Sequence, residues 1–282
     1  MLPIVSLPDF GSAHPGHDVA GEAVTLSWPE ERIAHARMTR GAEMNTLTIA
    51  LIAELGAVLS AAARHRARVL ILTGSGRAFC CGAHLKYFTD ADPPIGRAPL
   101  QVRDNYLAPI AELFDRFETM PYPLIAAING YALGGGGEMA LSCDLRLMAD
   151  TARVGLPETK IGAIPGAGGV QKLHRLIGRG KALEWILLSR HVEAPEALHF
   201  GFANAVHPAS QLDQAALDLA RSVIGLSPDA IAQAKAAIHV SGDVDLATAR
   251  RYGLETLTTL IGGPDWIEGM AAFQEKRPPH YA

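Results

Sequence analysis

Two short apolar runs, each preceded by a helical stretch, constrain the fold of this chain most strongly. The runs 68-RVLILTG-74 and 123-PLIAAIN-129 have the length and continuity of strands that are buried on both faces of a sheet. The stretches before them, 46–65 and 101–120, are longer and read as helices. In the first stretch, apolar residues recur at helical spacing on one face: Leu51, Leu55, Val58, Leu59 and Ala62. This alternation of helix and buried strand indicates an α/β domain.

The remaining segments extend this organisation. Further strands are expected at 23–28, 32–39 and 145–149. From about residue 171 the pattern is mostly helical. Ser227 and Pro228 supply the N-cap and the first-turn proline of one helix, which Gly242 is expected to end. We therefore expect three parts: a flexible N-terminal arm over 1–20, a core over 21–205 and a helical C-terminal region over 206–282.

Composition narrows the class of protein. The chain has 282 residues, of which 49% are apolar and 19% charged, as in ordinary soluble globular proteins. A formal net charge of −4 gives no reason to expect nucleic acid as a partner. The best candidate for a membrane span, 123–143, is interrupted by Asn129, four glycines and Glu138, so no membrane association is expected.

The three cysteines, Cys80, Cys81 and Cys143, are too few for a disulfide framework. No Cys-x-x-Cys or His-x-x-x-His pattern accompanies them, so no metal site is expected. The N-terminus also lacks the basic start and long apolar stretch of a secretory signal. Reduced cysteines without such a signal point to the cytoplasm.

The stretch 129-NGYALGGGGEMALSCD-144 places four consecutive glycines directly before a glutamate and an apolar helical turn. Glycine costs roughly 0.5–1 kcal/mol relative to alanine in a helix or strand, so Gly134–Gly137 should have a local purpose. A phosphate-binding loop would continue with Gly-Lys-Ser/Thr, whereas Glu138 follows here. A dinucleotide fingerprint needs an acid about twenty residues on, but Glu158 does not lie at a clean strand end. The Gly-x-Ser-x-Gly motif of serine hydrolases is absent.

A site built from backbone donors remains. If a helix begins near Gly136, the amide of Gly135 can point outward at an oxyanion, because the first N–H groups of a helix have no partner within it. A second donor could come from 79-FCCGAHL-85, another glycine-containing turn after a buried strand. Two such amides would make an oxyanion hole, in which one donor is typically worth ~3 kcal/mol of barrier.

Two carboxylates accompany these donors. Glu138 lies in the first turn of the glycine-led helix, where compensation of the helix dipole is an ordinary explanation worth at most ~1 kcal/mol. Glu158 lies in the irregular segment 155-GLPETKIGAIPGAGG-169, where a simple surface-loop glutamate would also fit. If both carboxylates line one pocket, they could hold a water between them and divide general acid and base work. The residues alone leave both interpretations open.

Three stretches of this chain resemble a known family: 68-RVLILTGSGRAFCCGAHLKYF-88, 123-PLIAAINGYALGGGGEMALSCDLRLMA-149 and 153-RVGLPETKIGAIPGAGGVQKLHRLIG-178. In this order they resemble the crotonase superfamily, specifically enoyl-CoA hydratase, and the resemblance runs from about residue 23 to 278. It implies a crotonase-like spiral of ββα units with a helical C-terminal trimerisation region. The expected assembly is a homotrimer or a dimer of trimers.

The resemblance also implies roles for the site residues. The amides of Ala83 and Gly135 would hold the thioester carbonyl of an acyl-CoA substrate. Both Glu138 and Glu158 would bind the attacking water, the first helping to activate it and the second exchanging the proton at the α-carbon. The implied reaction is reversible syn addition of water to a 2-enoyl-CoA, giving a 3-hydroxyacyl-CoA. CoA is part of the substrate, and neither a separate cofactor nor a metal is implied.

Other positions match the family's substrate contacts. Lys86 matches a position that contacts CoA phosphate, although an exposed lysine could also be ordinary surface. Phe273 and Lys276 match tail positions that can reach a CoA, sometimes that of the neighbouring subunit. The segment 88–106 falls where the family varies most and shapes the acyl pocket, without naming the acyl group.

His84 departs from the family pattern. The family usually has Gly-x-Asp, whereas this chain has Gly82-Ala83-His84. In one interpretation His simply caps the following helix less well than Asp, at a cost of about 1 kcal/mol. In the other, His84 lies near the bound thioester and alters the pocket or its pH response.

Other functions stay open at this point. The nearest is another crotonase-type reaction, double-bond isomerisation or thioester hydrolysis; isomerases often keep only one of the two acids, so the pair favours hydration. Some relatives bind RNA as well as CoA, and 172-KLHRLIGRGK-181 is the most basic patch of this chain. A non-catalytic homologue within an oligomer is the last alternative, and the presence of both acids argues against it.

Overall fold

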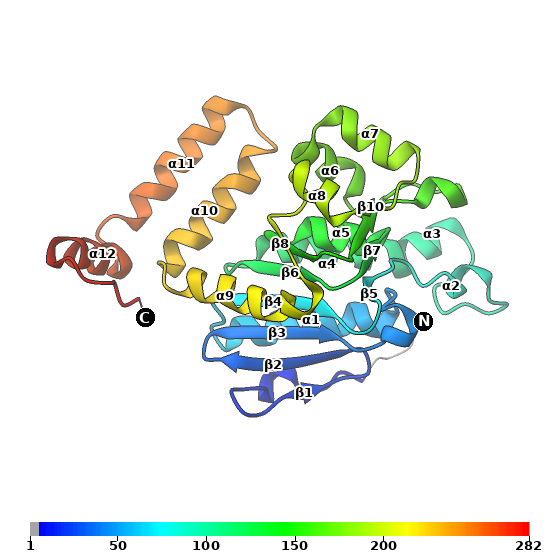
Figure 1. Ribbon diagram of the computed structural model, residues 1–282, viewed down its shortest axis with the longest axis horizontal. Coiled ribbons are helices and arrows are strands. Elements are labelled where there is room, and N and C mark those ends of the chain that lie inside the picture. Colours follow the sequence, from blue (N-terminus) through cyan, green and yellow to red (C-terminus); the bar gives the residue numbers. More distant parts are fainter. Residues whose placement is uncertain (1–5, 282) are drawn as a thin grey trace.

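The computed structural model describes residues 6–281, which form two β-sheets surrounded by helices (Figure 1). The larger sheet has the strand order β1 (Val19–Ala20), β2 (Val24–Glu30), β3 (Ile33–Met38), β4 (Val69–Gly74), β6 (Leu124–Ile128), β8 (Leu145–Ala149) and β11 (Ala205–His207). The smaller sheet has the order β10 (Val192–Glu193), β9 (Arg153–Gly155), β7 (Tyr131–Leu133) and β5 (Ala78–Cys80).

Helices occupy most of the remaining chain. The α-helices are α1 (Ile49–Arg64), α2 (Lys86–Thr89), α3 (Pro99–Val102), α4 (Ala108–Thr119), α5 (Gly135–Ser142), α6 (Gly169–Ile177), α7 (Arg179–Leu187), α8 (Ala194–His199), α9 (Leu212–Ile224), α10 (Pro228–Ser241), α11 (Leu246–Leu260) and α12 (Pro264–Glu275). Short 3-10 turns lie at η1 (Phe10–Ser12), η2 (Gly41–Glu43), η4 (Glu158–Ile161) and η5 (Ala209–Gln211), and η3 (Arg103–Leu107) is a π-helical segment.

Successive strands alternate between the two sheets. β4, β6 and β8 run parallel in the larger sheet, and the strand that follows each of them, β5, β7 or β9, lies parallel to its counterparts in the smaller sheet. Helices follow each pair: α2 to α4 after β5, α5 after β7 and α6 after β9. This ββα spiral confirms the expected α/β fold.

The buried strands and the first long helix agree with the sequence predictions. Every residue of β4 and β6 is buried, as expected for strands covered on both faces. The predicted apolar face of α1 is buried throughout: Leu51, Leu55, Val58, Leu59 and Ala62. α10 begins after the Ser227 N-cap and ends at Gly242, also as predicted. The helix expected over 101–120 is instead divided by the π-helical segment η3.

The N-terminal segment is more ordered than its composition predicts. Residues 1–5 lie outside the described part, but Phe10 and Ala13 are buried and β1 pairs with β2. The buried carboxylate of Glu54, on α1, accepts hydrogen bonds from the amides of Glu22, Ala23 and Val24 at 2.8–2.9 Å. Apolar anchors and strand pairing thus join Phe10, Ala13 and β1 to the core, whereas the flexibility expected for the arm over 1–20 stays a prediction.

The C-terminal helices α10 to α12 extend from one side of the molecule (Figure 1). Lys235 attaches α10 to the core: its ammonium group donates to Asp144 Oδ2 at 2.8 Å and to the carbonyls of Phe117 and Tyr122. Helix α11 has no buried residue in the described chain. Among the described residues, no helix has the length and apolar character needed to cross a membrane.

Candidate active site

The glycine run allows two turns to pack directly against each other. The turn after β5 brings the carbonyl oxygen of Cys80 to only 1.9 Å from the point where a Cβ on Gly136 would stand. Gly134, which precedes α5, has φ 56° and ψ −128°, a backbone conformation that residues other than glycine rarely adopt. The glycines are therefore required by the close approach of backbone to backbone.

This packing brings two backbone amides together. The amide nitrogen of Ala83 lies 3.8 Å from the point where a Cβ on Gly135 would stand. Gly135 is the first residue of α5, so its N–H has no acceptor within the helix. Within residues 6–281, neither amide donates a hydrogen bond to another group. The geometry is therefore suited to hold an anionic oxygen with two donors.

Tyr106 supports the turn that carries Ala83. Its buried hydroxyl accepts a hydrogen bond from the His84 amide at 2.8 Å and donates one to the Leu47 carbonyl at 2.5 Å. Leu47 in turn donates to the Gly82 carbonyl at 2.8 Å. No sequence signal pointed to Tyr106. In the structure it lies in the π-helical segment η3, and π-helical insertions often mark functional sites.

His84 does not cap the following helix. Its Nδ1 lies 2.9 Å from Thr46 Oγ1, and its ring packs edge-on against Tyr87 with centroids 4.7 Å apart. Helix α2 has no side-chain cap. Burial lowers the pKa of His84, with Glu43 acting in the opposite direction. The missing cap agrees with the interpretation that His replaces Asp at a small cost in capping, while the contacts of the ring with Thr46 and Tyr87 place it in an aromatic environment beside Ala83. An effect of His84 on the pocket or its pH response stays a prediction.

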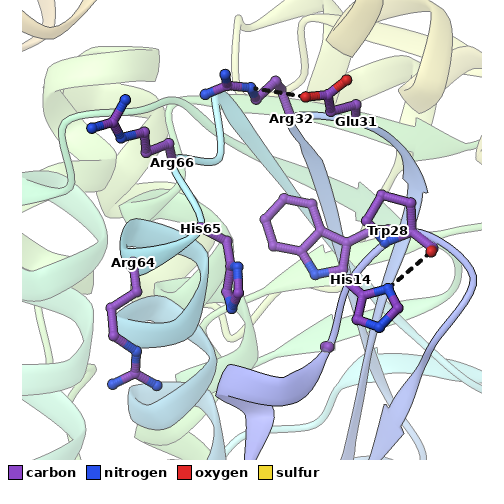
Figure 2. Close-up of a pocket in the computed structure, with 9 residues that line it drawn as sticks. His14, Trp28, Glu31, Arg32, Arg64, His65 and Arg66 are labelled. Atoms are coloured by element: carbon purple, nitrogen blue, oxygen red, sulfur yellow. Dashed lines mark hydrogen bonds and ion pairs between the residues drawn. The ribbon is translucent and has the colours of Figure 1, made fainter.

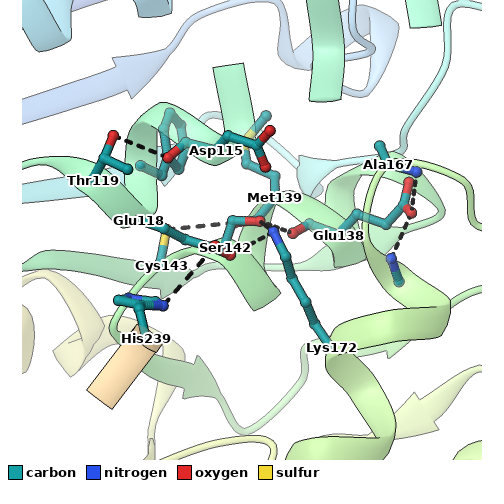
Figure 3. A network of polar contacts seen from close by, with 12 residues as sticks. Asp115, Glu118, Thr119, Glu138, Met139, Ser142, Cys143, Ala167, Lys172 and His239 are labelled. Atoms are coloured by element: carbon teal, nitrogen blue, oxygen red, sulfur yellow. Dashed lines mark hydrogen bonds and ion pairs between the residues drawn. The ribbon is translucent and has the colours of Figure 1, made fainter. Parts of the chain in front are cut away.

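Glu138 is a buried carboxylate held by backbone donors. Its Oε1 accepts hydrogen bonds from the amides of Ala167 and Gly169, both at 2.8 Å (Figure 3). Only 4% of the residue is exposed. The carboxylate therefore does not simply compensate the dipole of its own helix, because its donors belong to the loop that leads into α6.

Glu158 lies beside the same glycine run. Its Oε1 is 3.1 Å from the point where a Cβ on Gly134 would stand. Its Oε2 is buried and has no hydrogen-bond partner in the described part of the chain. A buried acceptor without a partner is costly unless a water or substrate satisfies it. Glu158 is thus not an ordinary surface-loop glutamate.

The two carboxylates influence each other's protonation. Burial raises the pKa of Glu158 to about 7, and the nearby Glu138 charge acts in the same direction. Burial also raises the pKa of Glu138, opposed by its two backbone hydrogen bonds and by Lys172. A carboxyl that titrates near neutrality can both donate and accept a proton under physiological conditions. The structure therefore brings together Ala83, Gly135, Glu138 and Glu158, as the sequence resemblance implied.

The other predicted contacts lie further out. Lys86 is exposed at the start of α2. Phe273, which is 81% exposed, and Lys276 lie on or just after α12, at the far end of the molecule from α2 (Figure 1). Within one chain the structure does not bring Phe273 and Lys276 to the Ala83 turn. Their predicted role would require the neighbouring subunit.

The structure has two notable cavities, only one of which lies near this arrangement. One, of about 330 Å³, lies in the segment expected to shape the acyl pocket and is lined in part by Tyr87, Phe88 and Arg97. The other, of about 310 Å³, lies around Trp28, His65 and three arginines (Figure 2). His65 caps the C-terminal end of α1, whereas Leu47 and the Ala83 turn lie at its N-terminal end, roughly 24 Å away for a sixteen-residue helix. The Trp28 cavity is therefore not part of the carboxylate site.

No cluster suited to a metal ion occurs in residues 6–281.

The two-sheet ββα spiral defines a crotonase-fold protein, and comparison with known proteins agrees. The sequence model described as enoyl-CoA hydratase/isomerase matches residues 29–282, and the chain belongs to this family. The crystal structure of enoyl-CoA hydratase from Bacillus anthracis superimposes with a TM-score of 0.86 at 38% identity, covering 92% of this chain and 99% of that one.

Two curated relatives are similar over nearly their full length. The 2,3-dehydroadipyl-CoA hydratase of Escherichia coli is 35% identical over 253 residues, covering 89% of this chain and 96% of the relative. The short-chain-enoyl-CoA hydratase of Clostridium acetobutylicum is 33% identical over 250 residues, covering 88% and 93%. The chain is thus an enzyme of the crotonase superfamily.

Replacing Gly136 by alanine tests the contact between the two turns. The added methyl would collide with the Cys80 carbonyl, and neither backbone segment can move without separating the Ala83 and Gly135 amides. We expect Gly136→Ala to lower the free energy of unfolding by about 1–3 kcal/mol, as overpacking does. The matched control is Gly180→Ala in α7, where nothing lies within 4 Å and stability should hold or rise slightly. Equal denaturation midpoints for Gly136→Ala and wild type would contradict this packing.

Replacing Glu158 by glutamine tests its raised pKa through stability. A folded-state pKa of about 7 exceeds the ordinary value of 4.5, so the folded protein binds the proton more tightly than the unfolded chain. The wild type therefore loses stability as pH rises from about 5 through 7. Glu158→Gln should be more stable than wild type at pH 8 by roughly 1–2 kcal/mol, discounted for partial exposure, and no more stable at pH 5. Thermal denaturation at both pH values, with exposed Glu31→Gln as control, measures this; parallel pH profiles would contradict it.

Proposed function

We propose that this protein is an enoyl-CoA hydratase, which adds water reversibly and syn to a 2-enoyl-CoA and gives a 3-hydroxyacyl-CoA. One observation carries the proposal: Glu138 and Glu158 lie beside the glycine run, and so do the two amides of Ala83 and Gly135, which have no partner in the described chain. The Escherichia coli and Clostridium acetobutylicum relatives are named as enoyl-CoA-type hydratases, which supports the proposal.

The proposed mechanism assigns one task to each group. The thioester oxygen accepts from the Ala83 and Gly135 amides, so that the π electrons of the double bond can move onto it as water attacks C3. Glu138 takes a proton from this water, and protonated Glu158 delivers a proton to C2 as the electrons return. Glu158, with its pKa of about 7, suits a proton donor at neutral pH. A proton passes from Glu138 to Glu158 to complete the cycle. The reaction involves no net redox change, so the proposal includes no redox cofactor.

The test is the absorbance of the conjugated thioester after the protein is added to crotonyl-CoA. Wild type should remove the absorbance, whereas Glu138→Gln and Glu158→Gln should each lose at least about 100-fold in kcat, the size of a typical general acid or base contribution. Equal thermal midpoints at pH 5 would show that the variants are folded. Hydration that survives both substitutions would contradict the mechanism.

The same assay, followed by mass spectrometry, separates the related reactions. Hydration adds the mass of one water, isomerisation leaves the mass unchanged, and thioester hydrolysis releases CoA. If wild type is inactive on crotonyl-CoA, a bulkier or branched acyl-CoA is the next substrate, because the acyl group is not specified by the residues of the site. A cytoplasmic location stays a prediction from the sequence.

The RNA-binding alternative loses its main support in the structure. Three cations of the basic patch are paired with acids of the same chain: Lys172 with Glu118, Arg175 with Asp243 and Lys181 with Glu184. These pairs reduce the charge available to phosphates.

We further propose that the chain assembles through its C-terminal helices as a homotrimer or a dimer of trimers. Apolar side chains are exposed along α11 and α12, too many for a solvated surface: Leu246, Leu254, Leu257, Ile261, Trp266, Ile267, Met270 and Phe273. A second copy would cover them and could bring Phe273 and Lys276, with Lys86, to a bound CoA.

Light scattering after size exclusion tests this assembly. We expect three or six times the chain mass of 29.9 kDa, and a smaller species for the double variant Leu254→Glu/Leu257→Glu. These charges would be buried without partners in the interface, which is unfavourable. A wild type that runs as a monomer at micromolar concentration would contradict the proposal.

A further inference from the structure

Lys172 joins three helices at the back of the carboxylate site. Its ammonium group, on α6, lies 2.5 Å from Glu118 Oε1 on α4 and donates to Ser142 Oγ on α5 at 2.9 Å (Figure 3). The Lys172 and Glu118 side chains are only 20% and 23% exposed. Lys172 is thus a partly buried cation with two partners, Glu118 and Ser142.

Lys172 also lies against the loop that holds Glu138. Gly168 has φ 118°, and a Cβ there would stand 2.9 Å from Cε of Lys172 and 3.1 Å from its Nζ. The Lys172 amide donates to the Gly168 carbonyl at 2.8 Å. Gly168 is flanked by Ala167 and Gly169, whose amides bind the Glu138 carboxylate. The Lys172 side chain therefore packs against the residue that lies between the two donors to Glu138.

The contact with Ser142 reaches Glu138 from its own helix. The Ser142 hydroxyl, one turn further along α5, donates to the Glu138 carbonyl at 3.0 Å and accepts from Lys172. One side chain thus packs against the loop before α6 and, through Ser142, is hydrogen-bonded to α5. Lys172 touches neither of the amides proposed to bind the thioester.

Lys172 also acts on Glu138 through its positive charge. Burial raises the pKa of Glu138, and the Lys172 charge opposes this rise. Several other titratable groups face this cluster from the packed elements: Glu158 on η4, Glu118 on α4, Cys143 and Asp144 after α5, and His239 and Lys235 on α10.

We propose that Lys172 is a positioning residue for Glu138: anchored by Glu118 and Ser142, its side chain fixes the loop that binds the carboxylate and places a positive charge beside it. This inference rests on the proposed hydration for its kinetic test alone. The charge favours ionised Glu138, the form that accepts a proton from water.

The kinetic test compares Lys172→Met, which keeps the length but removes the charge, with Lys172→Arg, which keeps it. In Lys172→Met the acid limb of the kcat profile should move up by roughly one pH unit, because loss of a nearby opposite charge raises a carboxyl pKa by this amount or more. At pH values below the midpoint of the wild-type acid limb, kcat of Lys172→Met should fall toward one tenth of the wild-type value, and above both midpoints the two should agree. KM should change less than about twofold, since Lys172 does not touch substrate. Lys172→Arg should restore most of the profile.

Arg175→Met is the matched control on the same helix. Arg175 forms an exposed ion pair with Asp243, so its loss should leave the pH profile in place. A Lys172→Met profile that superimposes on wild type, or one lowered equally at every pH, would overturn the positioning role and leave Lys172 a purely structural residue.

A stability cycle tests the same inference without catalysis. Lys172→Met is combined with Glu138→Gln, and thermal midpoints are measured at pH 8. The loss of Tm caused by Lys172→Met should be about 2–4 °C larger when Glu138 is present than in the Glu138→Gln background, because only the carboxylate needs the charge. Equal losses in both backgrounds would overturn the inference even if the protein proves inactive on every enoyl-CoA.

Discussion

The close contact between the end of β5 and the first turn of α5, the Cys80 carbonyl against Gly136, holds the whole site together. No side chain can stand between these turns, and their separation sets the spacing of the Ala83 and Gly135 amides. The small sheet holds the turns in place, because β5 and β7 pair in parallel and end side by side. A small sheet whose strands have only two or three residues therefore determines the geometry of the proposed oxyanion hole. Tyr106 completes this frame by occupying the His84 amide and leaving that of Ala83 free.

The surroundings of the two glutamates differ in a way that suits different tasks. Glu138 is fixed through one oxygen by two amides, whereas Glu158 keeps a buried oxygen without a partner in the described chain. The two amide hydrogen bonds favour the charged form of Glu138, whereas Glu158, which lacks such donors on its buried oxygen, has a pKa near 7. Pairs of acids whose surroundings push their protonation apart are a recurring basis of acid and base catalysis. Lys172 adds to this difference, because its contacts with Ser142 and Gly168 link it to Glu138 and not to Glu158.

Five of the seven strands of the larger sheet (β2, β3, β4, β6 and β8) and the glycine-led helix could be predicted from the sequence, because their signals are local, whereas the short strands β1 and β11 were not predicted. The runs that form β4 and β6 are continuous and apolar, and the cap at Ser227 needs only neighbouring residues. The strands of the smaller sheet were not predicted individually, since three residues are too few to show a period. The buried anchors Phe10 and Ala13 were missed because their burial depends on distant partners.

The site shows the same limit. Spacing alone left Glu138 and Glu158 with ordinary explanations, and the family resemblance was needed to pair them. The donors to Glu138 lie about thirty residues further along the chain, and Tyr106 reaches the Ala83 turn from a π-helical segment. Such contacts arise from the tertiary fold, so no local pattern predicts them.

The most direct test of the account is the infrared spectrum of a bound saturated acyl-CoA labelled with ¹³C at the thioester carbonyl. Proline would remove either amide hydrogen but would also disturb the backbone at that position, so the bound carbonyl is observed instead. Hydrogen bonds from the amides lower the frequency of the carbonyl they hold. If both amides bind the thioester oxygen, the stretching frequency of the labelled carbonyl should shift to lower wavenumber on binding to wild type. Glu138→Gln retains both amides and should give the same shift. A carbonyl that keeps its frequency in water, in samples where calorimetry shows the ligand bound, would contradict the central claim that Ala83 and Gly135 bind the thioester oxygen.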